Sequence, residues 1–191
     1  KPGAAEISAY DPLSKRLFVV NGAQGSVDIL DLINPAAPVL LGTLTSTDLG
    51  SGLGGANSIA IYNGIVAIAV EAAVKQDNGS VIFYRASDLT RLTAVTVGAL
   101  PDMLTFTPDG SRIVVANEGE PNSYGQPTSV DPVGSISVIS VPGLTPTATS
   151  ISPVVTAITF DSYNTQQNAL RAAGVRLFGP GATVPQDLEP K

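Results

Sequence analysis

Three short phrases of similar sequence decide the fold: Gly25-Ser26-Val27-Asp28-Ile29-Leu30, Gly79-Ser80-Val81-Ile82-Phe83-Tyr84 and Gly134-Ser135-Ile136-Ser137-Val138-Ile139. Their glycines are separated by 54 and then by 55 residues. Each phrase is a β-rich run preceded by glycine, which is typical of a strand that follows a tight turn. A phrase that recurs at this spacing indicates a repeat architecture.

The residues around each phrase repeat as well. Residues 11–21 align without gaps on residues 107–117, and both segments contain a turn followed by an apolar strand. In the middle unit, Asn63-Gly64 is a two-residue hairpin turn before the next strand. The remaining predicted strands precede each turn, at Ala5–Tyr10, Ser58–Tyr62 and Met103–Phe106, or follow each phrase, at Val39–Leu44, Leu92–Val97 and Thr145–Ile151.

Four short antiparallel strands in about 45–55 residues are the content of one β-propeller blade. We therefore predict an all-β chain, residues 1–191, with blades at about 4–45, 56–98 and 101–151. An immunoglobulin-like sandwich also has many short strands, but it does not repeat its own sequence three times. Because a closed ring needs about four to eight blades, we expect this chain to be a fragment of a larger propeller. Further blades of the same protein, or other copies, would complete it.

Residues 152–186 interrupt the repeat and predict an insertion. Residues 154–160 alternate and predict an extra strand, and residues 164–174 predict a short helix. Ser162 or Asn164 is suited to cap that helix, and Gly174 is suited to end it. The last residues, 187–191, resemble the approach to the strand at Met103 and predict the start of a further blade.

The composition excludes several classes of chemistry. The chain has no Cys and no His, which removes thiol nucleophiles, Ser-His-Asp catalysis and imidazole or thiolate metal sites. The formal net charge of −6 argues against a nucleic-acid partner. No apolar run reaches the ~18 residues of a transmembrane helix. The glycine-rich segment 50–55 lacks the lysine of a phosphate loop, and we expect no organic cofactor.

Carboxylates recur at the same points of the repeat. In a propeller, the loops before the inner strands and after the second strands lie on one face, around the central channel. Such oxygen ligands suit Ca²⁺, which takes six to eight of them in flexible geometry. Taken singly, each residue is as well explained as a turn or strand-end residue, and the spacing matches no compact calcium motif. The candidate metal ligands are Glu6, Glu71, Asp102, Glu118 and Glu120.

Several phrases resemble the choice-of-anchor I family over nearly the whole chain. They include residues 3–7, 70–73 and 99–110, Asn117-Glu118-Gly119-Glu120-Pro121, residues 169–174, Phe178-Gly179-Pro180-Gly181 and residues 186–190. The resemblance implies a secreted, periplasmic or cell-surface-attached bacterial protein, and a propeller domain longer than this chain. Some relatives are labelled alkaline phosphatases.

These observations leave three functional hypotheses open. The leading one is a surface or secreted propeller that acts as a binding scaffold, with a cation site on its acidic loop face. The second is a calcium-dependent phosphoesterase, in which a metal-bound water attacks a phosphate ester. The third is a structural component of the envelope or matrix.

Overall fold

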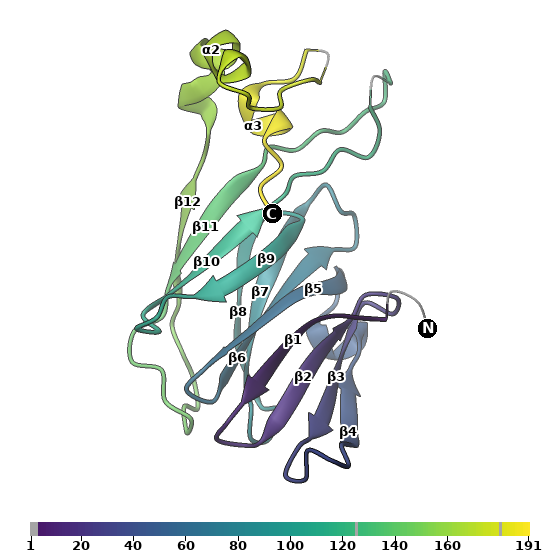
Figure 1. Cartoon of the computed structure of the whole chain (residues 1–191), viewed down its shortest axis with the longest axis vertical. Coiled ribbons are helices and arrows are strands. Elements are labelled where there is room, and N and C mark those ends of the chain that lie inside the picture. Colours follow the sequence, from purple (N-terminus) through teal and green to yellow (C-terminus); the bar gives the residue numbers. More distant parts are fainter. Residues whose placement is uncertain (1–3, 125, 180) are drawn as a thin grey trace.

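The computed structural model describes residues 4–124, 126–179 and 181–191. It contains three four-stranded antiparallel sheets, each formed by strands that are consecutive in the chain (Figure 1). Sheet 1 consists of β1 (Ala5–Asp11), β2 (Arg16–Asn21), β3 (Ser26–Asp31) and β4 (Val39–Leu44). Sheet 2 consists of β5 (Leu53–Tyr62), β6 (Ile65–Ala72), β7 (Asn78–Arg85) and β8 (Arg91–Ala99). Sheet 3 consists of β9 (Pro101–Phe106), β10 (Arg112–Asn117), β11 (Ser135–Ser140) and β12 (Val154–Ile158).

The sheets stack so that β5 packs between β1 and β9. This arrangement, with the first strand of each sheet innermost, is that of neighbouring propeller blades. The predicted all-β class and the four-stranded antiparallel sheets are therefore confirmed.

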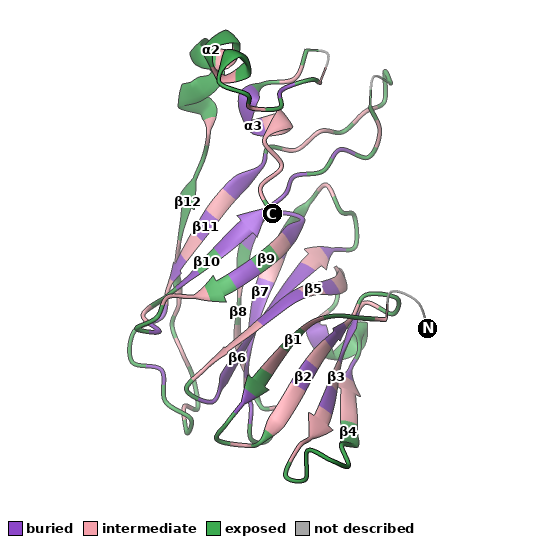
Figure 2. Cartoon of the chain, in the orientation of Figure 1, coloured by how far each residue is buried: buried purple, intermediate pink, exposed green. Residues whose placement is uncertain are grey.

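The core lies in two layers, one between each pair of neighbouring sheets. Strand β6 contributes to both: Val66, Ile68 and Val70 face sheet 1, whereas the alternate residues 65, 67 and 69 face sheet 3. Successive side chains of a strand point to opposite faces, so a central sheet covered on both sides is apolar throughout. Figure 2 shows this contrast between the buried middle sheet and the more exposed outermost strands β4 and β12.

The glycines of the repeated phrases lie at the junctions between sheets. A Cβ on Gly25 would lie 2.8 Å from the Cα of Gly55 on β5, and one on Gly79 would lie 2.5 Å from Cδ of Pro101 on β9. A Cβ on Gly134 would likewise lie 2.6 Å from Cδ of Pro190. The glycine therefore recurs because the next segment passes too close for a side chain.

The fourth strand of the third sheet differs from the prediction. It is β12, Val154–Ile158, which pairs with β11 along its whole length, whereas residues 145–151 form no strand. The carbonyls of Leu144 and Ala148 accept hydrogen bonds from the side chains of Asn63 and Arg85, so this segment is held against the end of sheet 2. Residues 154–158 are therefore part of the repeat and not an extra strand.

The predicted helix of the insertion is present, but it begins differently. A 3₁₀-helix, η1 (Asp161–Gln166), leads directly into α2 (Gln167–Ala172), and neither predicted residue caps it. Asn164 instead accepts a hydrogen bond from the backbone N–H of Val184, the first residue of α3 (Val184–Asp187). Gly174 follows α2 with φ of 91°, as expected for a residue that ends a helix.

The last residues repeat the geometry of the connection between sheets 2 and 3. Leu100 has a φ of 48° and precedes Pro101, and Glu189 has a φ of 33° and precedes Pro190. Each proline then lies against the glycine of a repeated phrase. Residues 188–191 are not a strand, and the start of a further blade at 187–191 stays a prediction that this geometry favours.

The outward faces of sheets 1 and 3 carry partly exposed hydrophobic side chains. On sheet 3 these include Val114, which alternates with the core residues Ile113 and Val115, and on sheet 1 they include Leu40. In the described part of the chain, no helix has the length and apolar character needed to cross a bilayer.

Candidate functional site

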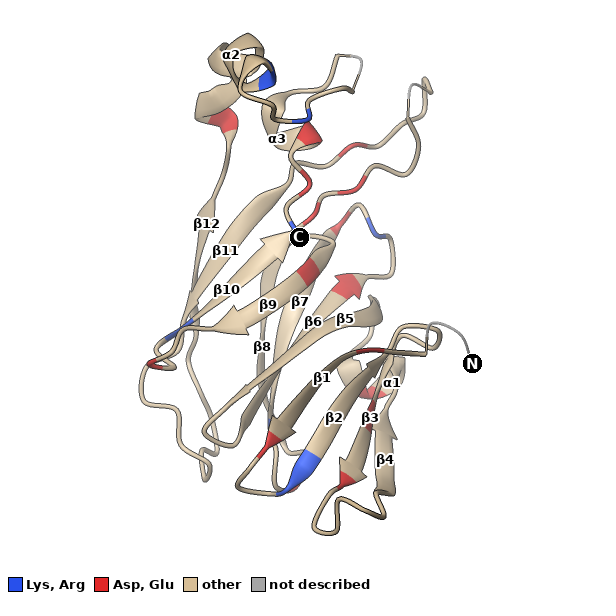
Figure 3. Ribbon diagram, viewed as in Figure 1, with Lys and Arg blue, Asp and Glu red and all other residues tan. Residues whose placement is uncertain are grey.

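Four of the five predicted carboxylates occupy equivalent ends of the three sheets. The start of each first strand pairs with the end of the second, which brings Glu6 of β1, Glu71 of β6 and Asp102 of β9 to one end, here called the loop end. Glu118 directly follows β10 at the same end, and Glu120 begins the long β10–β11 connection. Figure 3 shows that acidic residues recur at this end of the sheets.

Glu118 is the most buried of the five, with 7 % of its surface exposed. Its carboxylate forms an ion pair of 2.8 Å with the ammonium group of Lys191. Burial raises the pKa of Glu118, and the charges of Asp102 and Glu120 raise it further, against the opposing effect of Lys191. This carboxylate therefore already has a cation as its partner.

Glu71 and Glu6 have different neighbours from Glu118. Glu71 pairs with Lys75 at 3.4 Å, and the carboxylate of Glu6 lies over the backbone of Gly22. Among residues 4–124, 126–179 and 181–191, no three carboxylates come together in a way that could hold a metal ion. The loop end is thus acidic as predicted, but the five residues do not form one ligand set, and calcium stays a prediction.

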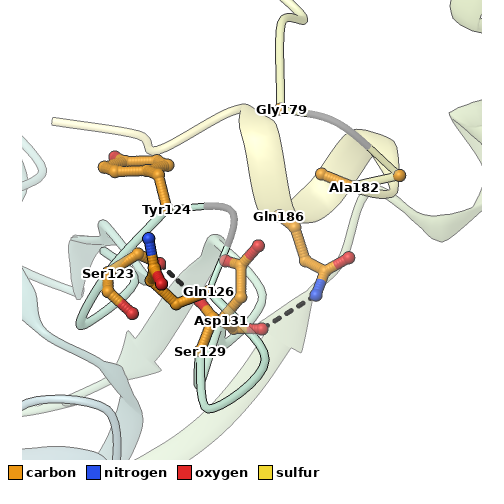
Figure 4. Close-up of a pocket in the computed structure, with 9 residues that line it drawn as sticks. Ser123, Tyr124, Gln126, Ser129, Asp131, Gly179, Ala182 and Gln186 are labelled. Carbon is orange, nitrogen blue, oxygen red and sulfur yellow. Dashed lines mark hydrogen bonds between the residues drawn. The ribbon is translucent and has the colours of Figure 1, made fainter.

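A cavity of about 190 Å³ lies where the β10–β11 connection meets the C-terminal segment (Figure 4). The connection is held as a loop by reciprocal hydrogen bonds between Asn122 and Val130, and Gln186 of α3 donates a hydrogen bond of 2.9 Å to the carbonyl of Asp131. The described lining is polar and uncharged apart from one carboxylate: Ser123, Tyr124, Gln126, Ser129, Asp131, Gly179, Gly181, Ala182 and Gln186.

Asp131 is the lining residue with unused hydrogen-bonding capacity. Its Oδ1 atom is buried and has no hydrogen-bond partner among the described residues. Burial raises the pKa of Asp131, and the negative charges of Asp187 and Glu189 add to this effect. A buried carboxylate oxygen without a donor carries a desolvation cost, which is consistent with the raised pKa of Asp131.

Two aromatic rings lie beside this cavity. The rings of Tyr124 and Phe178 have centroids 6.3 Å apart, and the guanidinium of Arg176 lies 5.4 Å from the Phe178 centroid. The Tyr124 hydroxyl donates a hydrogen bond of 2.9 Å to Glu189, which raises the pKa of Tyr124 to about 12. The phenol therefore stays protonated and holds the loop against the C-terminal segment.

Sequence reasoning did not place Asp131 and Tyr124 in a cavity. It also missed Gln186 and the residues near Gly179, because no local signal shows that the C-terminal segment folds back onto the β10–β11 connection. Ser123 and Ser129 belong to no sequence motif, because they line the cavity only where two distant segments of the chain meet.

The three stacked four-stranded sheets define a partial β-propeller. The chain belongs to the choice-of-anchor I family: the profile of the choice-of-anchor I domain matches residues 6–191. No curated protein matches the chain.

Solved structures confirm the propeller fold. Hydrazine synthase of Kuenenia stuttgartiensis is similar with a TM-score of 0.50 and 17 % identity, over 80 % of this chain and 37 % of that one. Sqt1 of Saccharomyces cerevisiae has a TM-score of 0.50 and 9 % identity, over 82 % of this chain and 36 % of that one. The chain thus spans about a third of the length of these propellers, and at such identity the likeness concerns the fold alone.

Proposed function

We propose that this chain is part of a secreted or surface-displayed bacterial propeller that binds a neutral, hydroxyl-rich ligand, such as a saccharide, at its loop end. Membership of the choice-of-anchor I family supports the location. The cavity beside Asp131 supports the binding role, and it is the single observation that carries the proposal. Further blades of the same protein, or other copies, would cover the outward apolar faces of sheets 1 and 3.

The chemistry of the cavity favours an uncharged ligand. No Lys or Arg is present among its described lining residues, and Asp187 and Glu189 add negative charge nearby. A phosphate or carboxylate ligand would be repelled, whereas hydroxyl groups can donate to Asp131 and exchange hydrogen bonds with Ser123 and Ser129. The exposed ring of Tyr124 offers an apolar surface to the C–H face of a sugar ring.

The cavity size limits the ligand to about one ring. Its volume of about 190 Å³ is below the ~300 Å³ at which pockets for drug-sized molecules begin. A single sugar unit at the end or side of a longer glycan fits this limit. Affinity for one unit is expected to be weak, as it is for any small interface with few contacts.

A glycan array probed with the full protein tests the proposal. We expect a subset of neutral glycans to bind, and we expect Asp131→Ala to weaken binding about ten- to a hundredfold, because hydrogen bonds to charged groups contribute about 1.5–3 kcal/mol. Asp161→Ala is the matched control, since it removes the same charge from the exposed start of η1, outside the cavity. Absence of glycan binding, or equal binding by both variants, would refute the proposal.

The same array tests the calcium hypothesis. Binding that is unchanged by a chelator would agree with a site made of hydroxyls, amides and one carboxylate. Binding that requires added Ca²⁺ would show that carboxylates of the loop end act as metal ligands.

A further inference from the structure

A second cavity, of about 360 Å³, lies between sheets 2 and 3 and shares no described lining residue with the cavity beside Asp131, here called the loop-end cavity. One wall is the end of β8, including Val97 and Gly98, and the other consists of β11 and β12. Its volume falls within the ~300–1,000 Å³ of small-molecule sites. The described lining residues are mostly apolar and none is charged: Asn78, Thr96, Val97, Gly98, Ala99, Pro132, Val133, Ser135, Ser137, Val155, Ala157 and Thr159.

Two buried serines line this cavity. Ser135 and Ser137 are 7 % and 2 % exposed, and both hydroxyl oxygens accept hydrogen bonds from the side-chain amide of Asn117, at 3.1 and 2.9 Å. No hydrogen bond donated by either hydroxyl is found among the described residues, and Oδ1 of Asn117 is also without a partner. Because buried hydroxyl protons are normally donated, these two are available to a molecule in the cavity.

The first sheet shows how the same position is satisfied elsewhere in the repeat. There Asn21 donates to Asp28, and the hydroxyl of Thr43, the residue paired with Asp28, donates to the same carboxylate at 2.6 Å. In sheet 3 the corresponding pair is Ser137 and Ala157, and alanine has no polar side chain to offer. The carboxylate of Asp28 in sheet 1 therefore has two side-chain donors, whereas Ser137 in sheet 3 has no polar side chain opposite it. Oδ1 of Asn21 and Oγ of Ser26 in sheet 1 are without partners among the described residues, as Oδ1 of Asn117 is in sheet 3.

Gly98 allows this arrangement to form. A Cβ on Gly98 would lie 2.6 Å from Oγ of Ser135 and 2.7 Å from Cβ of Asn117, so only glycine lets β8 pass this close. At the junction of sheets 1 and 2 the connection between sheets is longer and contains α1 (Ser46–Leu49), whose Leu49 is fully buried in the core. Between sheets 2 and 3 the chain turns directly at Leu100, without such a helix.

We infer that this cavity is a binding site for a small neutral molecule with an apolar body and a hydrogen-bond-accepting oxygen at one end. The apolar body would contact Val97, Val133 and Val155, and the oxygen would accept from the hydroxyls of Ser135 and Ser137. A charged ligand is disfavoured because no lining residue would compensate the desolvation of its charge. The site differs in place and in ligand class from the loop-end cavity.

Titration of the protein with cyclohexanone, followed by protein NMR chemical shifts, tests the inference. This probe has one apolar ring and one carbonyl acceptor, and a ligand of this size is expected to bind with a millimolar Kd. Cyclohexylammonium is the matched control ligand, since it has the same ring with a charged donor in place of the acceptor. We expect saturable shifts in β8, β11 and β12 with cyclohexanone and none with cyclohexylammonium.

Variants then separate ligand binding from folding. Ser135→Ala combined with Ser137→Ala should weaken cyclohexanone binding at least about tenfold. Ala157→Leu fills the cavity and should abolish binding while Asn117 keeps both its acceptors. Ser140→Ala is the control, because it lies on β11 and does not line the cavity. Absence of saturable shifts, or binding to folded Ala157→Leu protein equal to that of the unchanged protein, would overturn the inference.

Discussion

Replacing Gly79 by alanine tests the reason why glycine begins each repeated phrase. The added Cβ would lie 2.5 Å from Cδ of Pro101 and 2.6 Å from the carbonyl oxygen of Val70, whereas ordinary contacts begin at 3.4 Å. Sheet 2 and the start of β9 would therefore have to separate by roughly 0.9 Å, which loses dispersion contacts along the junction. Backbone strain does not contribute, because Gly79 is not among the residues with positive φ.

The expected loss in the free energy of unfolding follows from two opposing effects. Overpacking of a close contact costs about 1–3 kcal/mol, while replacing glycine lowers the entropy of the unfolded chain and returns about 0.4–1 kcal/mol. The free energy of unfolding should therefore fall by about 1–2 kcal/mol, which lowers Tm by about 2–8 °C for a chain of this size.

Thermal unfolding followed by circular dichroism measures this change. Gly42→Ala is the matched control: Gly42 lies in β4, has no atom within 4 Å of its added Cβ, and should leave Tm unchanged or slightly raised. If Gly79→Ala melts at the same temperature as Gly42→Ala, the recurring glycine is not required by the packing between sheets, and the explanation of the repeat fails.

Three further predictions concern single interactions. Lys191→Ala should raise the pKa of Glu118 further, because the ammonium group that opposes burial is lost; NMR titration of the carboxyl carbon measures this. The pKa of Asp109 is lowered to about 2, chiefly by a hydrogen bond from the Thr107 hydroxyl, so its stabilising effect should be complete above pH about 4 and lost toward pH 2. Asp109→Asn should reduce that part of the acid dependence of Tm, and an unchanged dependence would contradict the prediction. Tyr84→Phe removes a buried hydrogen bond to a carbonyl of α1 and should cost about 1 kcal/mol in chemical denaturation, whereas no loss would show that the bond is dispensable.

Much of the fold could be predicted because its signals are local. The turn at Asn63-Gly64 and the apolar strand β6 that follows it depend on neighbouring residues, and both appear in the structure as expected. The fourth strand of sheet 3 differs from the prediction because the segment around residues 145–151 is held against sheet 2, where the carbonyls of Leu144 and Ala148 accept hydrogen bonds from the side chains of Asn63 and Arg85. These hydrogen bonds join residues that are far apart in the chain, so no local stretch of sequence predicts them.

The candidate sites, too, were predictable only in part. The repeat placed carboxylates at one end of every sheet, since equivalent positions in a repeat share a location. Whether they meet was not predictable, because the separation of Glu6, Glu71 and Glu118 depends on the angles between sheets. The loop-end cavity and the cavity between sheets 2 and 3 both arise where distant segments come together.

By itself, the amino-acid sequence determined the repeat, its turns and apolar strands, and the acidic character of the loop end, because strand composition and turn chemistry act between near neighbours. Only the tertiary structure decided which groups lack partners. Asp28 and Ser137 hold equivalent positions, yet Asp28 accepts a hydrogen bond from Thr43 on the neighbouring strand, whereas Ser137 is paired with Ala157, which has no polar side chain. Burial makes that difference matter, since an unused hydrogen-bonding group costs free energy only where water is excluded.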